Sequence, residues 1–130
     1  MSTFSVTIKV ANPNLPELRT WRSLVATVDS GASLTTIPAN LLGGLGIASY
    51  STRPFVLADG RRVESPVGNA LIRIDGEAVT DLIVLGEPNE PVLLGARTLE
   101  GLFLGVDPVN KRLVPVDGLR YLNAHCSMFQ

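Results

Sequence analysis

Polar and apolar residues alternate at the start of the chain. Between Phe4 and Val10 the even-numbered residues are apolar and the odd-numbered ones are polar, which is the period of a strand with one buried face. A second strand is predicted from about Arg19 to Val28, where apolar residues are frequent. It ends at a turn of small residues, Asp29–Ser33.

Turn sequences divide the rest of the chain into short strands. The pattern predicts three hairpins, with strands at residues 54–57 and 61–63, 69–74 and 77–85, and 104–106 and 112–116. A short buried strand is expected at Val92–Gly95, and short helices are expected at Pro38–Leu45 and Ala96–Leu102. Because strands and helices do not alternate, we expect an all-β fold, a small closed antiparallel β-barrel with one or two short helices.

Length and composition indicate one folded domain. The 130 residues are 45% apolar and 18% charged, enough to bury a core and too few charges for a disordered chain. We assign residues 1–116 to the domain and residues 117–130, which show no clear period, to a C-terminal tail. Eleven basic against twelve acidic residues leave no basic excess for a nucleic-acid partner.

Cysteine and histidine are nearly absent, which limits the disulfide and metal-binding chemistry open to the chain. Cys126 and His125 are the only residues of their kinds and lie together in the tail. A single cysteine excludes an intrachain disulfide and a multi-thiolate metal site, so neither a metal nor a cofactor is expected. The first ten residues lack the apolar run of a signal peptide, and no apolar stretch is long enough to span a membrane. A cytoplasmic protein with no membrane partner is the prediction.

The catalytic candidate is Asp29. It follows the apolar run Leu24–Val28 and precedes Ser30, Gly31 and Ala32. A carboxylate at the end of a buried strand, in a turn of small residues, allows a substrate backbone to approach closely. The alternative interpretation is an ordinary turn in which the aspartate caps the backbone.

A second segment of the sequence bears on how the segment around Asp29 is interpreted. Val28–Ser33 resembles the apolar-Asp-Ser/Thr-Gly-Ala/Ser signature of aspartic proteases, and Pro91–Leu99 resembles the second signature of the retropepsin-like branch. The intervening segments Leu71–Gly76 and Asp81–Gly86 match in order, so the similarity extends from about Thr20 to Leu102. The chain is therefore identified by resemblance as a retropepsin-like aspartic protease with an acid-protease barrel.

The resemblance implies that each chain supplies half a site. Asp29 would pair with the same residue of a second copy in a homodimer, and the two carboxyl groups would share one proton. Ser30 would hydrogen-bond across the dimer axis, and Gly31 would leave room for the substrate and hydrogen-bond the peptide through its carbonyl. Ala32 belongs to the same supporting loop. The apolar-Gly pair Leu94 and Gly95 would support the catalytic loop from behind.

The resemblance also implies a flap, the hairpin that closes over substrate. Ala58, Asp59 and Gly60 match its tip; by spacing alone a plain surface hairpin turn is the better explanation, and the neighbouring signature favours the flap. The tip has one glycine, unlike the glycine-rich tip of retroviral enzymes. The final hairpin at residues 104–116 is more similar to stand-alone prokaryotic members.

Three functions remain open from the sequence. The favoured one is an aspartic endopeptidase that cuts an extended polypeptide bound under the flap. The second is a catalytically silent dimer of the same fold that binds extended peptide segments. The third is a structural β-domain without a peptide groove, which requires both signatures to be coincidental.

Overall fold

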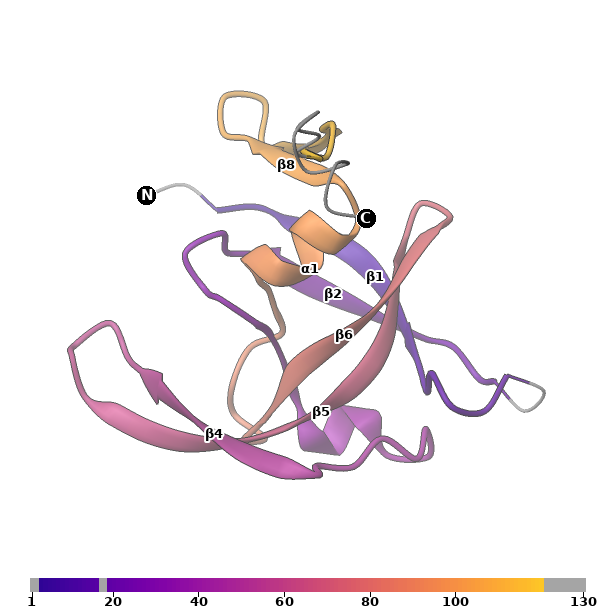
Figure 1. Ribbon diagram of the computed structural model, residues 1–130, viewed down its shortest axis with the longest axis vertical. Coiled ribbons are helices and arrows are strands. Elements are labelled where there is room, and N and C mark those ends of the chain that lie inside the picture. The colour runs from indigo at the N-terminus through magenta and orange to yellow at the C-terminus, as the bar shows by residue number, and fades with distance from the viewer. Residues whose placement is uncertain (1–2, 17–18, 121–130) are drawn as a thin grey trace, which may run out of the picture.

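The computed structural model describes residues 3–16 and 19–120. Its regular elements are short, and strands predominate (Figure 1). The strands are β1 (Ser5–Ala11), β2 (Arg22–Val28), β3 (Thr35–Pro38), β4 (Ser51–Val56), β5 (Arg62–Ile74), β6 (Glu77–Gly86), β7 (Leu93–Leu94), β8 (Leu104–Asp107) and β9 (Arg112–Pro115). The helices are the 3₁₀ helix η1 (Ala39–Leu42) and the α-helix α1 (Ala96–Gly101). The predicted all-β class is confirmed.

Seven strands form one sheet in the order β1-β2-β7-β3-β6-β5-β4, and β1 also pairs with β5. Most pairings in this sheet are antiparallel, as predicted, but β2 runs parallel to β7 and β3 runs parallel to β6. The hydrophobic period reports which face of a strand is buried but not the direction of its partner, so the sequence could not reveal these pairings. β8 and β9 form a separate two-stranded sheet.

The core lies between the strands of the large sheet and α1. β-Branched and leucine side chains fill it, as alternating apolar positions of facing strands require. Its fully buried members include Ile8, Val10, Ala26, Ile37, Ala70, Ile72, Ile83 and Leu94. Leu99 and Leu102 close the core from the side of α1.

The region after Asp29 differs from the sequence prediction. A helix was expected at Pro38–Leu45, but Pro38 is the last residue of β3 and only Ala39–Leu42 form one 3₁₀ turn. Gly44 and Gly46 adopt positive φ angles of 82° and 73°, so the chain turns away before an α-helix can extend. The sequence analysis did not predict β3, although Thr35–Ile37 are β-branched.

β5 is a single long strand where the sequence predicted two pieces. Residues 62–67 pair with β4, and residues 67–74 pair with β6. Pro66 lies in the half that β6 does not cover, so its missing N–H costs no bond to β6. The β4–β5 hairpin therefore extends beyond the body of the sheet, where it projects at the lower left of Figure 1.

The other predicted elements are found close to their expected positions. The first strand, the hairpin of β5 and β6, the strand before Gly95 and the helix at Ala96–Gly101 are confirmed. The second strand begins at Arg22 rather than at Arg19. Within the described residues, no helix is long and apolar enough to cross a membrane. His125 and Cys126 lie outside the described residues.

Candidate active site

Asp29 lies in a tight turn directly after β2. Its side chain is half-buried, and its Oδ1 accepts a hydrogen bond from the backbone N–H of Gly31 at 3.1 Å. Its carbonyl accepts another from the N–H of Ala32 at 3.1 Å. These bonds hold the carboxyl group at the mouth of the turn, as small residues in such a turn allow. Ser30, which lies between Asp29 and Gly31 in the sequence, is exposed.

Backbone hydrogen bonds attach this turn to the segment that follows β7. The N–H of Asp29 donates to the carbonyl of Leu94 at 3.0 Å. The N–H groups of Ala96 and Arg97 donate to the carbonyls of Ala32 and Ser33 at 2.8 and 3.0 Å. Because β7 lies between β2 and β3 in the sheet, the turn that joins those two strands passes across the end of β7.

Gly95 is required by close packing at this crossing. A Cβ atom added there would contact the carbonyl carbon of Leu34, and would lie 2.5 Å from the Leu34 oxygen and 2.8 Å from the Thr35 nitrogen. Real Cβ atoms do not approach backbone so closely. The φ angle of Gly95 is an ordinary −92°, so the glycine serves for space rather than for backbone conformation. Leu94 beside it is fully buried, and the predicted supporting pair is found directly behind the turn.

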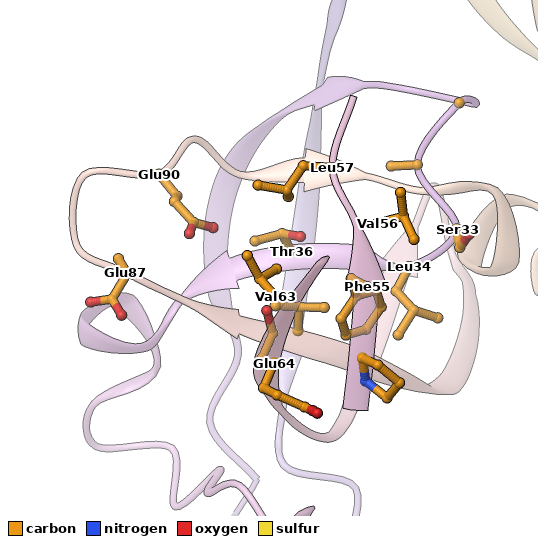
Figure 2. A pocket seen from close by; sticks show the side chains of 15 residues that line it. Ser33, Leu34, Thr36, Phe55, Val56, Leu57, Val63, Glu64, Glu87 and Glu90 are labelled. Carbon is orange, nitrogen blue, oxygen red and sulfur yellow. The ribbon is translucent and has the colours of Figure 1, made fainter. Parts of the chain in front are cut away.

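A groove lies between the Asp29 turn and the β4–β5 hairpin. Its volume is about 800 Å³. Its walls come from residues 31–34 of the turn, residues 54–57 and 63–65 of the hairpin, Thr36, Val84, Glu87 and Glu90. Figure 2 shows Leu34, Phe55 and Val56 on one side of the groove and Glu87 and Glu90 on the other.

The groove combines apolar walls with acidic side chains. Glu64, Glu87 and Glu90 line it, and no lysine or arginine does. No feature of the sequence marked these glutamates as part of a site. They are exposed, and none of them forms an ion pair with another described residue.

The tip of the β4–β5 hairpin is a turn closed by its own side chains. Leu57 and Arg61 are joined by a backbone hydrogen bond of 2.8 Å, and Gly60 adopts a φ of 89°. Asp59 accepts from the backbone N–H of Arg61 at 3.0 Å and from its guanidinium at 2.7 Å. The Arg61 backbone N–H, followed by the guanidinium, lowers the pKa of the Asp59 carboxyl below its ordinary value.

The predicted site residues therefore fall into two groups. Asp29, Ser30, Gly31 and Ala32 share one turn that Leu94 and Gly95 support, and of these four Gly31 and Ala32 line the groove. Ala58, Asp59 and Gly60 form the hairpin tip as predicted, but they do not line the groove. The hairpin contributes the strand residues on either side of the tip instead.

Sequence reasoning missed most of the groove wall. Leu34, Phe55, Val63 and Val84 line it, and each is one apolar residue among many in a strand-rich sequence. The pairing of β4 with β5 brings Phe55 and Val63 together, and the position of that hairpin opposite the turn makes Leu34 and Val84 part of the same wall. The sequence analysis also gave no role to Asp81 and Thr98, two buried polar residues below the turn.

No group of three or more His, Cys, Asp or Glu side chains in residues 3–16 and 19–120 is arranged to hold a metal ion. In comparisons with known proteins, no family model and no curated protein matches the chain.

Proposed function

We propose that the chain is one half of a homodimeric aspartic endopeptidase of retropepsin type, with an acid-protease barrel. The pairings from β1 through β2, β7, β3, β6 and β5 return to β1, which supports a closed barrel. The β4–β5 hairpin outside this ring corresponds to the flap. The resemblance of the two sequence signatures supports the assignment to this class of enzyme.

One observation carries the proposal: the two signature segments pack against each other beside a groove. The Asp29 N–H bonds to Leu94, and Gly95 fits against Leu34 with no room for a side chain. Residues that resemblance alone would bring together thus meet at the Asp29 turn, whose residues 31–34 line an 800 Å³ groove. A structural β-domain does not explain this arrangement, because it needs neither the crowded glycine nor the groove.

The reaction requires a second chain. Asp29 of each protomer would approach the dimer axis, where two adjacent carboxyl groups hold one proton between them because two negative charges at short distance repel. The ionised carboxylate takes a proton from a bound water, which attacks the peptide carbonyl. The protonated carboxyl donates to the developing oxyanion. The carboxyl that took the water proton then donates it to the leaving amine as the C–N bond breaks, and the other carboxylate takes back the proton of the tetrahedral intermediate.

The groove suits an extended polypeptide. Its apolar wall, with Leu34, Phe55 and Val63, offers contact to apolar side chains. The flap would exclude water above the scissile bond, which strengthens hydrogen bonds to the substrate. Substrate side chains that alternate along a strand would point in turn toward the flap and the turn.

The deciding experiment compares the wild type with Asp29→Asn in a mixed-peptide cleavage assay at pH 4 to 6. Asp75→Asn is the matched control, because Asp75 is an exposed aspartate in the turn between β5 and β6. We expect cleavage in the wild type and the control and none in Asp29→Asn, with all three proteins dimeric by sedimentation. Cleavage that survives in Asp29→Asn would refute the assignment. A stable wild-type dimer that binds peptides without cutting them would favour the silent binding module.

A further inference from the structure

A chain of buried hydrogen bonds runs below the Asp29 turn. Asp81 of β6 has a side chain only 4% exposed, and its Oδ2 accepts from the hydroxyl of Thr98 at 2.9 Å. The Thr98 hydroxyl is 2.6 Å from that of Thr35. The Thr35 oxygen accepts from the backbone N–H of Gly95 at 3.0 Å. Both threonines are fully buried.

The Asp81 side chain determines which group donates in each of these hydrogen bonds. Arg97 donates from Nε to Asp81 Oδ1 at 2.7 Å, and the Leu82 N–H donates to the same oxygen at 2.8 Å. Both oxygens of Asp81 serve as acceptors, and the Thr98 hydroxyl donates its proton to Oδ2. Thr98 then has only lone pairs left for the Thr35 hydroxyl, which must donate in turn. The Thr35 oxygen is left free to accept from Gly95.

The last bond acts on the peptide group that also holds Asp29. The N–H of Gly95 and the carbonyl of Leu94 belong to one planar peptide unit. Thr35 accepts from the N–H side, and the Asp29 N–H donates to the carbonyl side at 3.0 Å. The orientation of this plane therefore sets the position of the Asp29 backbone.

We propose that Asp81, Thr98 and Thr35 form a directional hydrogen-bond relay that orients the Leu94–Gly95 peptide and thereby positions Asp29 for catalysis. These three are positioning residues, since they are buried beneath the turn and act through the Leu94–Gly95 peptide. The inference rests on the proposed peptidase activity. Displacement of a reacting group by a fraction of an ångström lowers the rate with little effect on binding, and a polar chain in a dry interior transmits such an effect because water cannot replace its members.

The test compares Thr98→Val, Thr98→Ser and Thr80→Val. Valine has the shape of threonine without the hydroxyl, serine restores the hydroxyl, and Thr80 is an exposed neighbour of Asp81. In Thr98→Val we expect kcat to fall about tenfold with KM within about twofold of the wild type. The pH profile of kcat should also change, because the distance between the two Asp29 carboxyl groups sets how strongly they share a proton. Thr98→Ser should restore most of the loss, and Thr80→Val should match the wild type.

A role confined to stability gives a different result. Thr98→Val would then unfold more easily, but its folded dimer would keep the wild-type kcat and pH profile, and this outcome overturns the relay. If the valine variant does not fold, NMR of the wild type decides. The hydroxyl protons of Thr35 and Thr98 should exchange slowly, and rapid exchange of either one overturns the proposal. A wild type without cleavage would refute the peptidase, whereas the NMR result tests the relay independently.

Discussion

Replacing Gly95 by alanine tests the packing behind the proposed catalytic turn. The φ and ψ angles of Gly95, −92° and 173°, suit alanine without strain. At such a position alanine stabilises a protein by about 0.4–1 kcal/mol, because it restricts the unfolded chain. The added Cβ would nevertheless lie 2.5 Å from the Leu34 oxygen, and the backbone of Leu34 or Gly95 would have to move before the contact reached even the 3.0 Å limit of real structures.

Steric overlap and chain entropy therefore predict opposite signs. Overpacking of a rigid interior costs about 1–3 kcal/mol, so Gly95→Ala should lower the free energy of unfolding by about that amount. The displaced atoms are backbone atoms on both sides of the Asp29 turn, so peptide cleavage by the folded dimer should fall as well, by about tenfold or more.

Urea unfolding followed by the fluorescence of Trp21, the only tryptophan, measures the change in stability at equal protein concentration. Gly76→Ala is the control, because Gly76 has a φ of 89° and no atom within 4 Å of an added Cβ. It should lose about 1 kcal/mol through backbone strain and keep its activity. An unchanged or increased stability in Gly95→Ala would refute the close approach on which the site depends.

Three further predictions address the core, the tip of the β4–β5 hairpin and the groove. Leu94→Ala should cost about 3 kcal/mol in urea unfolding, because it leaves a cavity under the turn. An NMR titration should give Asp59 a pKa below the ordinary value of about 3.9, and Arg61→Gln should raise it; a wild-type value at or above 3.9 would refute the hydrogen bonds at the tip. Because folding lowers this pKa, the hydrogen bonds of Asp59 stabilise the tip fully at pH values above the ordinary pKa of an aspartate. This stabilisation is lost as the pH falls through the lowered pKa of the folded protein. Phe55→Ala should raise KM for apolar peptides several-fold with a smaller effect on kcat, and an unchanged KM would remove the groove from the binding site.

The sequence alone predicted the short-range features of the fold and the position of the Asp29 turn. Alternation over Phe4–Val10 identified β1, and turn sequences identified the hairpins that join β4 to β5 and β5 to β6. These signals are local, because the hydrophobic period and the turn residues act over a few positions. Asp29 was found in the same way, by its place between an apolar run and small residues.

Other features depend on residues far apart in the sequence. The parallel pairing of β3 with β6 joins Thr35 to Ile83, and nothing in either segment specifies that partner. The relay from Asp81 through Thr98 to Thr35 has the same origin, since three separate elements supply its members. A buried threonine and a surface threonine are identical in the sequence, and only their packed neighbours distinguish them.

The sequence by itself therefore determined that the chain is β-rich, where it turns, and which carboxylate follows a buried strand. The tertiary structure decided what surrounds that carboxylate: the crowded Gly95, the groove beside it and the polar chain beneath it. The physical reason is that periodicity and turn chemistry are properties of neighbouring residues, whereas a groove and a buried hydrogen bond exist only when distant segments pack together.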